Sequence, residues 1–151
     1  MTRAQRILSA VLLLLPVVLA PAARAADVAT VTFEVDDQLK FPVASFEVKS
    51  GQTVKLTIKK TGTMPKASMA HNVVILKPGV NVDQFAIQAM TFAATEYIPT
   101  GSEAQIVAHT KLVGAGESDT IEFKAPAPGT YRFLCTFPGH FATMQGDMIV
   151  K

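Results

Sequence analysis

Apolar and polar residues alternate along several short segments of the chain, and this period of two is typical of half-buried β-strands. In TVKLTIKK, for example, the apolar face consists of Val54, Leu56 and Ile58. Turn signals such as Ser50-Gly51 and Pro128-Gly129 separate these segments. The expected strands are 28–35, two strands within 45–60, and 71–77, 105–110, 119–125, 129–135 and 146–151.

One segment has a helical period instead. NVDQFAIQAMTFAA (81–94) places its apolar residues three and four positions apart, and Asn81 or Asp83 is a candidate N-cap. The chain contains no internal repeat and no low-complexity linker. About eight short strands with one inserted helix predict an all-β sandwich with Greek-key connections.

The first 25 residues have the pattern of an export signal. Two arginines precede an apolar run (7–19), and Ala23-Arg24-Ala25 fits the A-x-A cleavage pattern. A retained membrane anchor is the alternative, but the run is short and proline-interrupted, whereas a spanning helix needs ~20 apolar residues. We expect a cleaved signal peptide (1–25), a single domain (26–151), no membrane anchor and a periplasmic location.

Removal of this segment changes the charge of the protein. The whole chain has 14 basic and 12 acidic residues, a net charge of +2. Without Arg3, Arg6 and Arg24 it has 11 basic residues and a net charge of about −1. A nearly neutral domain lacks the basic field that attracts nucleic acids. We therefore expect no nucleic-acid partner, and we expect a monomer.

The segment CTFPGHFATM (135–144) gathers three candidate metal ligands. It contains the only cysteine of the chain, followed by His140 and Met144. Thiolate and imidazole suit copper or zinc, but methionine is not a usual zinc ligand. Two histidines and a cysteine with a weak axial methionine are typical of an electron-transfer copper site.

Such a site needs a second histidine, and the chain offers His71 and His109. His71 begins an expected strand directly after the loop TGTMPKASMA, so it can meet the 135–144 loop at one end of the sandwich. His109 has a simpler interpretation as a solvent-facing histidine in the middle of a strand. We therefore favour His71.

Other interpretations of these residues are less complete. Cys135 alone could be a small buried apolar residue, and Met144 alone could belong to the core. Neither interpretation explains why three possible metal donors lie within ten residues. Neither explains why an exported protein keeps an unpaired cysteine among them. An enzyme with Cys135 and His140 as nucleophile and base would lack an orienting third residue. A copper carrier or storage protein remains the alternative.

The motifs CTFPGHFATMQGDMIVK, MAHNVVIL and IVAHTKLVGAGESDTIEF resemble those of azurins, small blue-copper proteins with the cupredoxin fold. The resemblance covers about residues 29–151. It implies one type 1 copper ion as the cofactor. The implied metal ligands are His71, Cys135 and His140 in the equatorial plane, Met144 in an axial position, and weakly the backbone carbonyl of Ala70.

The resemblance also implies residues around the ligands. The Asn72 side chain would tie the first-histidine loop to Thr136, and the backbone N–H groups of Asn72 and Phe137 would point at the cysteine sulfur. The ring edge of His140 would reach the surface through an apolar docking patch. The implied patch comprises Met64, Met69, Pro138, Phe141 and Ala142, with Phe137 beside them.

The function implied is that of an electron carrier and not of an enzyme. The protein would shuttle single electrons between redox partners such as c-type cytochromes or periplasmic reductases, through transient apolar contacts. Several departures from the azurin pattern accompany the resemblance, among them the following. Ala70 replaces a usual glycine, Lys60 stands where some relatives have a histidine, and a single cysteine excludes the usual disulfide.

Overall fold

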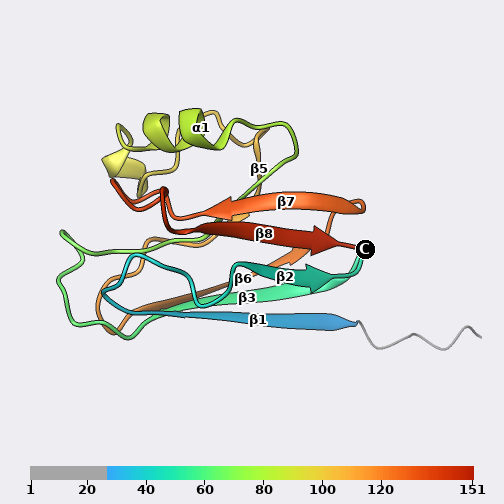
Figure 1. Ribbon diagram of the computed structural model, residues 1–151, viewed down its shortest axis with the longest axis horizontal. Coiled ribbons are helices and arrows are strands. Elements are labelled where there is room, and N and C mark those ends of the chain that lie inside the picture. The colour runs from blue at the N-terminus through green and yellow to red at the C-terminus, as the bar shows by residue number, and fades with distance from the viewer. Residues whose placement is uncertain (1–26) are drawn as a thin grey trace, which may run out of the picture.

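The computed structural model describes residues 27–151, which form two β-sheets packed face to face (Figure 1). One sheet has the strand order β1-β3-β6 and the other the order β2-β8-β7-β4-β5. This confirms the predicted all-β sandwich of about eight strands with one inserted helix. The expected signal peptide lies outside the described residues. The strands are β1 (Val28–Val35), β2 (Ser45–Val48), β3 (Thr53–Lys60), β4 (Val74–Leu76), β5 (Ile106–His109), β6 (Ser118–Lys124), β7 (Gly129–Leu134) and β8 (Gln145–Val150).

Strand direction brings distant loops to one end of the sandwich. β1 and β3 are parallel, and their last paired residues are Val35 and Lys60. The segments that follow the two strands therefore leave the sheet at the same end. β7 is antiparallel to β4, with Leu134 opposite Val74, so the end of β7 lies beside the start of β4. In Figure 1 these loops lie at the end of the molecule opposite the C-terminus.

Aromatic side chains fill the space between the sheets. Phe33 is fully buried, and its ring lies 5.2 Å from Phe41 and 5.3 Å from Phe133 in edge-to-face contacts. Gly146 of β8 lies against the same cluster, and a Cβ at this position would overlap the ring of Phe133. Close-packed interiors resist rearrangement, so this core gives the loops at its end a stiff base.

The helix is shorter than expected. α1 spans Val82–Ala89, and Asn81 is its N-cap, since its side-chain oxygen accepts a hydrogen bond from the backbone N–H of Gln84 at 2.9 Å. The chain then continues through turns into the 3₁₀ helix η1 (Ala93–Thr95). α1 covers the sheet that contains β7 (Figure 1) and buries Phe85 against Leu134 and its neighbours. None of the helices within residues 27–151 is long and apolar enough to cross a membrane.

β4 is also shorter than the expected strand 71–77. Regular pairing begins only at Val74, and His71 forms an isolated bridge with Val113. The strand is shorter because the backbone of residues 71–73 pairs with loop residues: the N–H of His71 donates to the carbonyl of Val113 at 3.0 Å. His71 therefore belongs to a loop that is tied to the segment after β5 by several hydrogen bonds.

Candidate metal centre

Three donor side chains meet in the interior at the loop end of the sandwich. Sγ of Cys135 lies 3.6 Å from Nδ1 of His140 and 4.0 Å from Nδ1 of His71. The ring centroids of the two histidines are 5.0 Å apart. All three residues are buried, and their ligand atoms lie within 4.8 Å of one another. His109 is exposed in β5 and is not part of this cluster.

The loop 135–144 is closed by its own backbone. Cys135 follows the last residue of β7, and its N–H donates a hydrogen bond to the carbonyl of Met144 at 3.0 Å. The N–H of Met144 donates in turn to the carbonyl of His140 at 2.9 Å. Gly139 allows the tight turn before His140, since its φ of 83° lies in the left-handed region that glycine adopts readily. The loop thereby directs His140 back toward the sulfur, and it holds Met144 fully buried beside them.

The ring of His71 is oriented from outside the cluster. Its Nε2 lies 3.0 Å from the carbonyl oxygen of Asp36, in the loop that follows β1. A carbonyl can only accept, so Nε2 carries the proton and Nδ1 presents its lone pair toward Cys135. Ala70, directly before this histidine, is fully buried.

Asn72 ties the two ligand-bearing loops together. Its side-chain oxygen accepts a hydrogen bond from the backbone N–H of Thr136 at 2.9 Å, and its Nδ2 donates to the Thr136 hydroxyl at 2.8 Å. Nδ2 also donates to the carbonyl of Glu96 at 3.4 Å. Both residues of the pair are buried. Such bonds fix the distance between segments 64 residues apart in the sequence.

Burial sets the protonation states of the cluster. It raises the pKa of the Cys135 thiol to about 11, while backbone N–H groups of Asn72 and Phe137 that bond to the sulfur oppose this rise. Burial, and then the neighbouring His71, lower the pKa of His140 to about 4. Burial also lowers the pKa of His71. At neutral pH both imidazoles are therefore neutral, which is the form that binds metals.

The geometry of the cluster fits a metal ion. First-row metals bind imidazole and thiolate at ~2.0–2.3 Å, so three such ligands around one ion lie about 3.5–4 Å apart. The two distances from Sγ, 3.6 and 4.0 Å, match this spacing. A cation there would also stabilise the thiolate that burial disfavours. The donor set, with a buried methionine at the end of the loop, suits copper better than zinc.

One ligand candidate reaches the surface. No residue within 27–151 forms a hydrogen bond with Nε2 of His140. In this part of the chain, every buried side-chain nitrogen or oxygen has a hydrogen-bond partner. Nε2 of His140 therefore touches solvent. Of the residues expected around it, Met64 and Ala142 are exposed, Met69, Pro138 and Phe141 are half-buried, and Phe137 is buried.

The sequence interpretation missed the surroundings of His71. Lys60, the last residue of β3, has a fully buried side chain that forms an ion pair with Asp37. The signal was present, because the inward-facing register of Val54, Leu56 and Ile58 continues to residue 60. The hydrogen bond from His71 to a backbone carbonyl left no signal in the sequence.

Comparison with known proteins gives consistent matches. Residues 28–151 match the family described as copper binding proteins, plastocyanin/azurin family. An azurin from Pseudomonas fluorescens biotype C is 36% identical over 125 residues, which cover 80% of this chain and 97% of that protein. The outer membrane protein H.8 of Neisseria gonorrhoeae is 41% identical over 120 residues and 78% of this chain. The match spans only 64% of the length of that relative.

Solved structures show the same fold. A dithionite-reduced auracyanin from Roseiflexus castenholzii superimposes with a TM-score of 0.73 at 38% identity, covering 82% of this chain and 97% of the other. Auracyanin A from Chloroflexus aurantiacus, described as a "blue" copper protein, gives a TM-score of 0.73 at 29% identity, covering 82% and 99% of the two chains. The family match agrees with the donor cluster, which fits a type 1 copper site. The chain belongs to the plastocyanin/azurin family of copper-binding proteins.

Proposed function

We propose that the protein is a type 1 copper protein that carries single electrons. The observation that carries this proposal is the buried cluster in which one thiol sulfur lies 3.6 and 4.0 Å from two imidazole nitrogens. His71, Cys135 and His140 are the proposed equatorial ligands, and Met144 is the proposed weak axial ligand. The backbone carbonyl of Ala70 would be a further weak contact. When bound, copper supplies a one-electron couple between its cuprous and cupric states.

The residues of the chain contribute rigidity to this function. The two oxidation states of copper prefer different geometries, so ligands that stay in place lower the cost of changing between them. The Asn72–Thr136 hydrogen bonds and the closed loop 135–144 restrain movement of the ligands. Because Cys135 and Met144 are fully buried, water would be excluded from a metal held at this sulfur.

Electrons would enter and leave through the ring edge of His140. The proposed docking patch around it consists of Met64, Met69, Pro138, Phe141 and Ala142. Transient redox encounters bury less than ~1,200 Å², which a small apolar patch can supply. We propose c-type cytochromes or periplasmic reductases as partners, with the protein acting as an exported monomer in the periplasm. The proposed mature domain is 26–151, after cleavage of the signal peptide 1–25.

A copper carrier or storage protein is the second candidate, because its sites also use histidine and sulfur ligands. The buried thiol and the hydrogen-bonded loops favour the electron carrier, since a carrier must release its metal readily. The deciding experiment is loading of the purified protein with cupric salt, followed by a visible spectrum and a challenge with chelator. An intense band near ~600 nm with slow copper loss supports the electron carrier. A colourless product, or copper that transfers rapidly to the chelator, contradicts it.

A further inference from the structure

The ion pair between the buried Lys60 and the half-buried Asp37 is not needed to fill the core. The side chain of Lys60 is 0% exposed, and it follows three apolar residues on the inward face of β3. Replacing a buried ion pair by apolar residues is often neutral or stabilising, because taking charges out of water is costly. An apolar residue at position 60 would continue the core, so stability alone does not explain the lysine.

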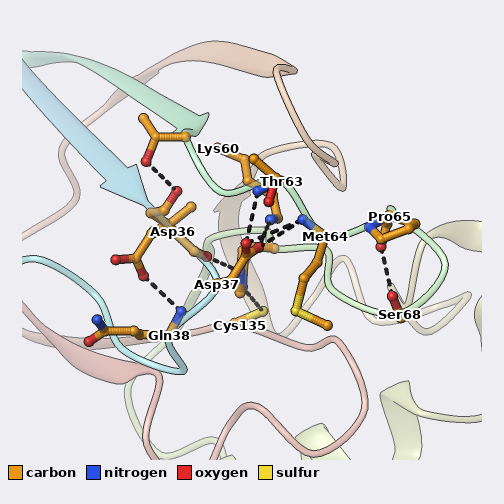
Figure 2. Close-up of polar contacts among 12 residues, drawn as sticks. Asp36, Asp37, Gln38, Lys60, Thr63, Met64, Pro65, Ser68 and Cys135 are labelled. Atoms are coloured by element: carbon orange, nitrogen blue, oxygen red, sulfur yellow. Dashed lines mark hydrogen bonds and ion pairs between the residues drawn. The ribbon is translucent and has the colours of Figure 1, made fainter.

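The partner carboxylate organises the loop that leads to the donor cluster. Asp37 accepts hydrogen bonds from the backbone N–H groups of Thr63 at 2.8 Å and Met64 at 3.2 Å, as well as from Lys60 (Figure 2). Gly62 lies against Asp37, and a Cβ there would overlap both the carboxylate and the backbone N of Asp37. The carboxylate therefore joins the segment after β1 to the segment after β3.

The neighbouring residue contacts a proposed copper ligand. The carbonyl of Asp36 accepts the hydrogen bond from Nε2 of His71, at 3.0 Å. The peptide that carries this carbonyl lies directly between Asp36 and the restrained Asp37. Movement of the carboxylate would therefore move the acceptor that orients the histidine ring.

We propose that the Lys60–Asp37 ion pair is a positioning element for His71. It holds the Asp36 carbonyl in place, and this carbonyl keeps the proton on Nε2 and leaves Nδ1 free for the metal. Outer contacts of this kind orient ligands and tune the metal site. The inference rests on the proposed function, since it assumes that His71 binds a metal.

The ion pair is also close enough to affect the ring electrostatically. Burial is the main cause of the lowered pKa of His71, and the hydrogen bond to the Asp36 backbone opposes it. The charge of Lys60 lowers this pKa further, while the charges of Asp37 and Asp36 raise it. The opposite effects of the two partners mean that the intact pair changes the field at the ring less than either charge alone. Positioning and charge effects can therefore be separated by replacing each partner.

The chain provides a matched control for the experiment. Lys59 is the adjacent residue of β3, and it forms an exposed ion pair with Glu34 at 3.4 Å. The test variants are Lys60→Met and Asp37→Asn, and the controls are Lys59→Met and Glu34→Gln. Gly62→Ala is a further variant without a change of charge. Its Cβ would overlap both the carboxylate and the backbone N of Asp37, so it displaces the Asp36–Asp37 peptide directly and tests the role of the Asp36 carbonyl.

Two measurements apply to each variant. Imidazole NMR of the metal-free full chain gives the protonated nitrogen of His71 and the solvent-exchange rate of its proton. Competition with chelators gives the affinity for Cu(I). We expect the test variants, but not the controls, to exchange the Nε2 proton at least about tenfold faster and to lose roughly 10–100-fold in Cu(I) affinity.

The outcomes distinguish this inference from the proposed function. If the unaltered protein binds no copper, the proposed function fails, while the NMR measurement still tests the positioning of His71. A proton on Nδ1 in the unaltered protein would overturn the inference, even if Lys60→Met fails to fold. Reduced stability with unchanged proton exchange and affinity would show that the pair is only structural. The reduction potential could instead shift in opposite directions in Lys60→Met and Asp37→Asn, while the exchange rate of the His71 proton stays unchanged. This result would show that the ion pair acts by charge alone, and it would also overturn the inference.

Discussion

The backbone N–H of Cys135 donates a hydrogen bond to the carbonyl oxygen of Met144 at 3.0 Å, so the first and last residues of the ligand loop are joined directly. The loop between them contains His140, whose carbonyl accepts from Met144. A shift of one donor in this loop therefore shifts the others. The loop behaves as one unit placed between β7 and β8.

Replacement of Cys135 by serine tests the proposed sulfur ligand. A hydroxyl is a harder and far less acidic donor than a thiol, so Cys135→Ser should abolish the intense blue absorption of the copper-loaded protein. The change is small, so the circular dichroism spectrum should remain that of a folded β-protein. A blue band in this variant would disprove the assignment of Cys135 as a ligand.

Replacement of Met144 by leucine tests the axial position. The two side chains have similar volumes, and such substitutions in a core usually cost less than ~1.5 kcal/mol. Met144→Leu should retain the blue colour and raise the reduction potential, because a weak donor to the cupric state is lost. The measurement is voltammetry of the loaded protein. An unchanged or lowered potential would argue against axial ligation.

Replacement of Asn72 by alanine tests the connection between the two ligand loops. The variant leaves the buried N–H and hydroxyl of Thr136 without their partner, which should lower the free energy of unfolding by ~1–3 kcal/mol. It should also broaden the visible band, because His71 and Cys135 are less well fixed. The matched control is Asn81→Ala, which removes the N-cap of α1 and should cost ~1 kcal/mol without a change in the spectrum. Equal spectra for both variants would contradict a role of Asn72 at the metal.

The metal-free protein should lose stability at both ends of the pH range. The pKa of His140 is lowered from 6.5 to about 4, so below pH 6.5 the unfolded chain binds more protons and the free energy of unfolding falls toward pH 4. The pKa of Cys135 is raised from 9.0 to about 11, so above pH 9 the unfolded thiol ionises first and the free energy of unfolding falls again. Chemical denaturation from pH 4 to 11 measures both limbs.

One variant tests the contribution of His140 to the acid limb. His140→Gln should reduce the decrease in stability below pH 6.5, and the part that remains should come from His71, whose pKa burial also lowers. An acid limb that persists unaltered in His140→Gln would show that a different group is responsible.

A charge in the docking patch tests the route of the electron. Met64 is 40% exposed, and Met64→Lys should slow electron self-exchange at least about tenfold, since two copies would then bring like charges together. The control is Met90→Lys, at a methionine that is 36% exposed at the end of α1. Neither change should alter the visible spectrum. Equal rates for the two variants would place electron exchange elsewhere on the surface.

Much of the fold could be predicted because its determinants are local. Alternating segments and turn residues located all eight strands within a few positions, and Asn81 was among the two expected N-caps. The lengths of β4 and α1 were predicted less well. Both depend on tertiary contacts: residues 71–73 pair with a loop from a distant part of the chain, and the helix ends where its buried face ends.

The donor residues were predictable from their chemistry and spacing, but the contacts that orient them were not. The choice of His71 over His109 agrees with the cluster that the structure brings together. The acceptor of the His71 proton is a backbone carbonyl 35 residues away, and backbone carbonyls carry no sequence signature. Lys60 could have been placed inside the protein from the period of β3, yet its partner Asp37 becomes apparent only when β1 and β3 are known to be parallel.

The order of the donors along the chain has a consequence for biosynthesis. His71 lies in the first half of the sequence, while the ligand loop immediately precedes β8, which pairs with both β2 and β7. A nascent polypeptide therefore cannot hold the centre together until the ligand loop and β8 have left the ribosome. Stable metal binding by all three donors would therefore follow synthesis of β8, and the compartment in which this domain folds would determine where copper is loaded.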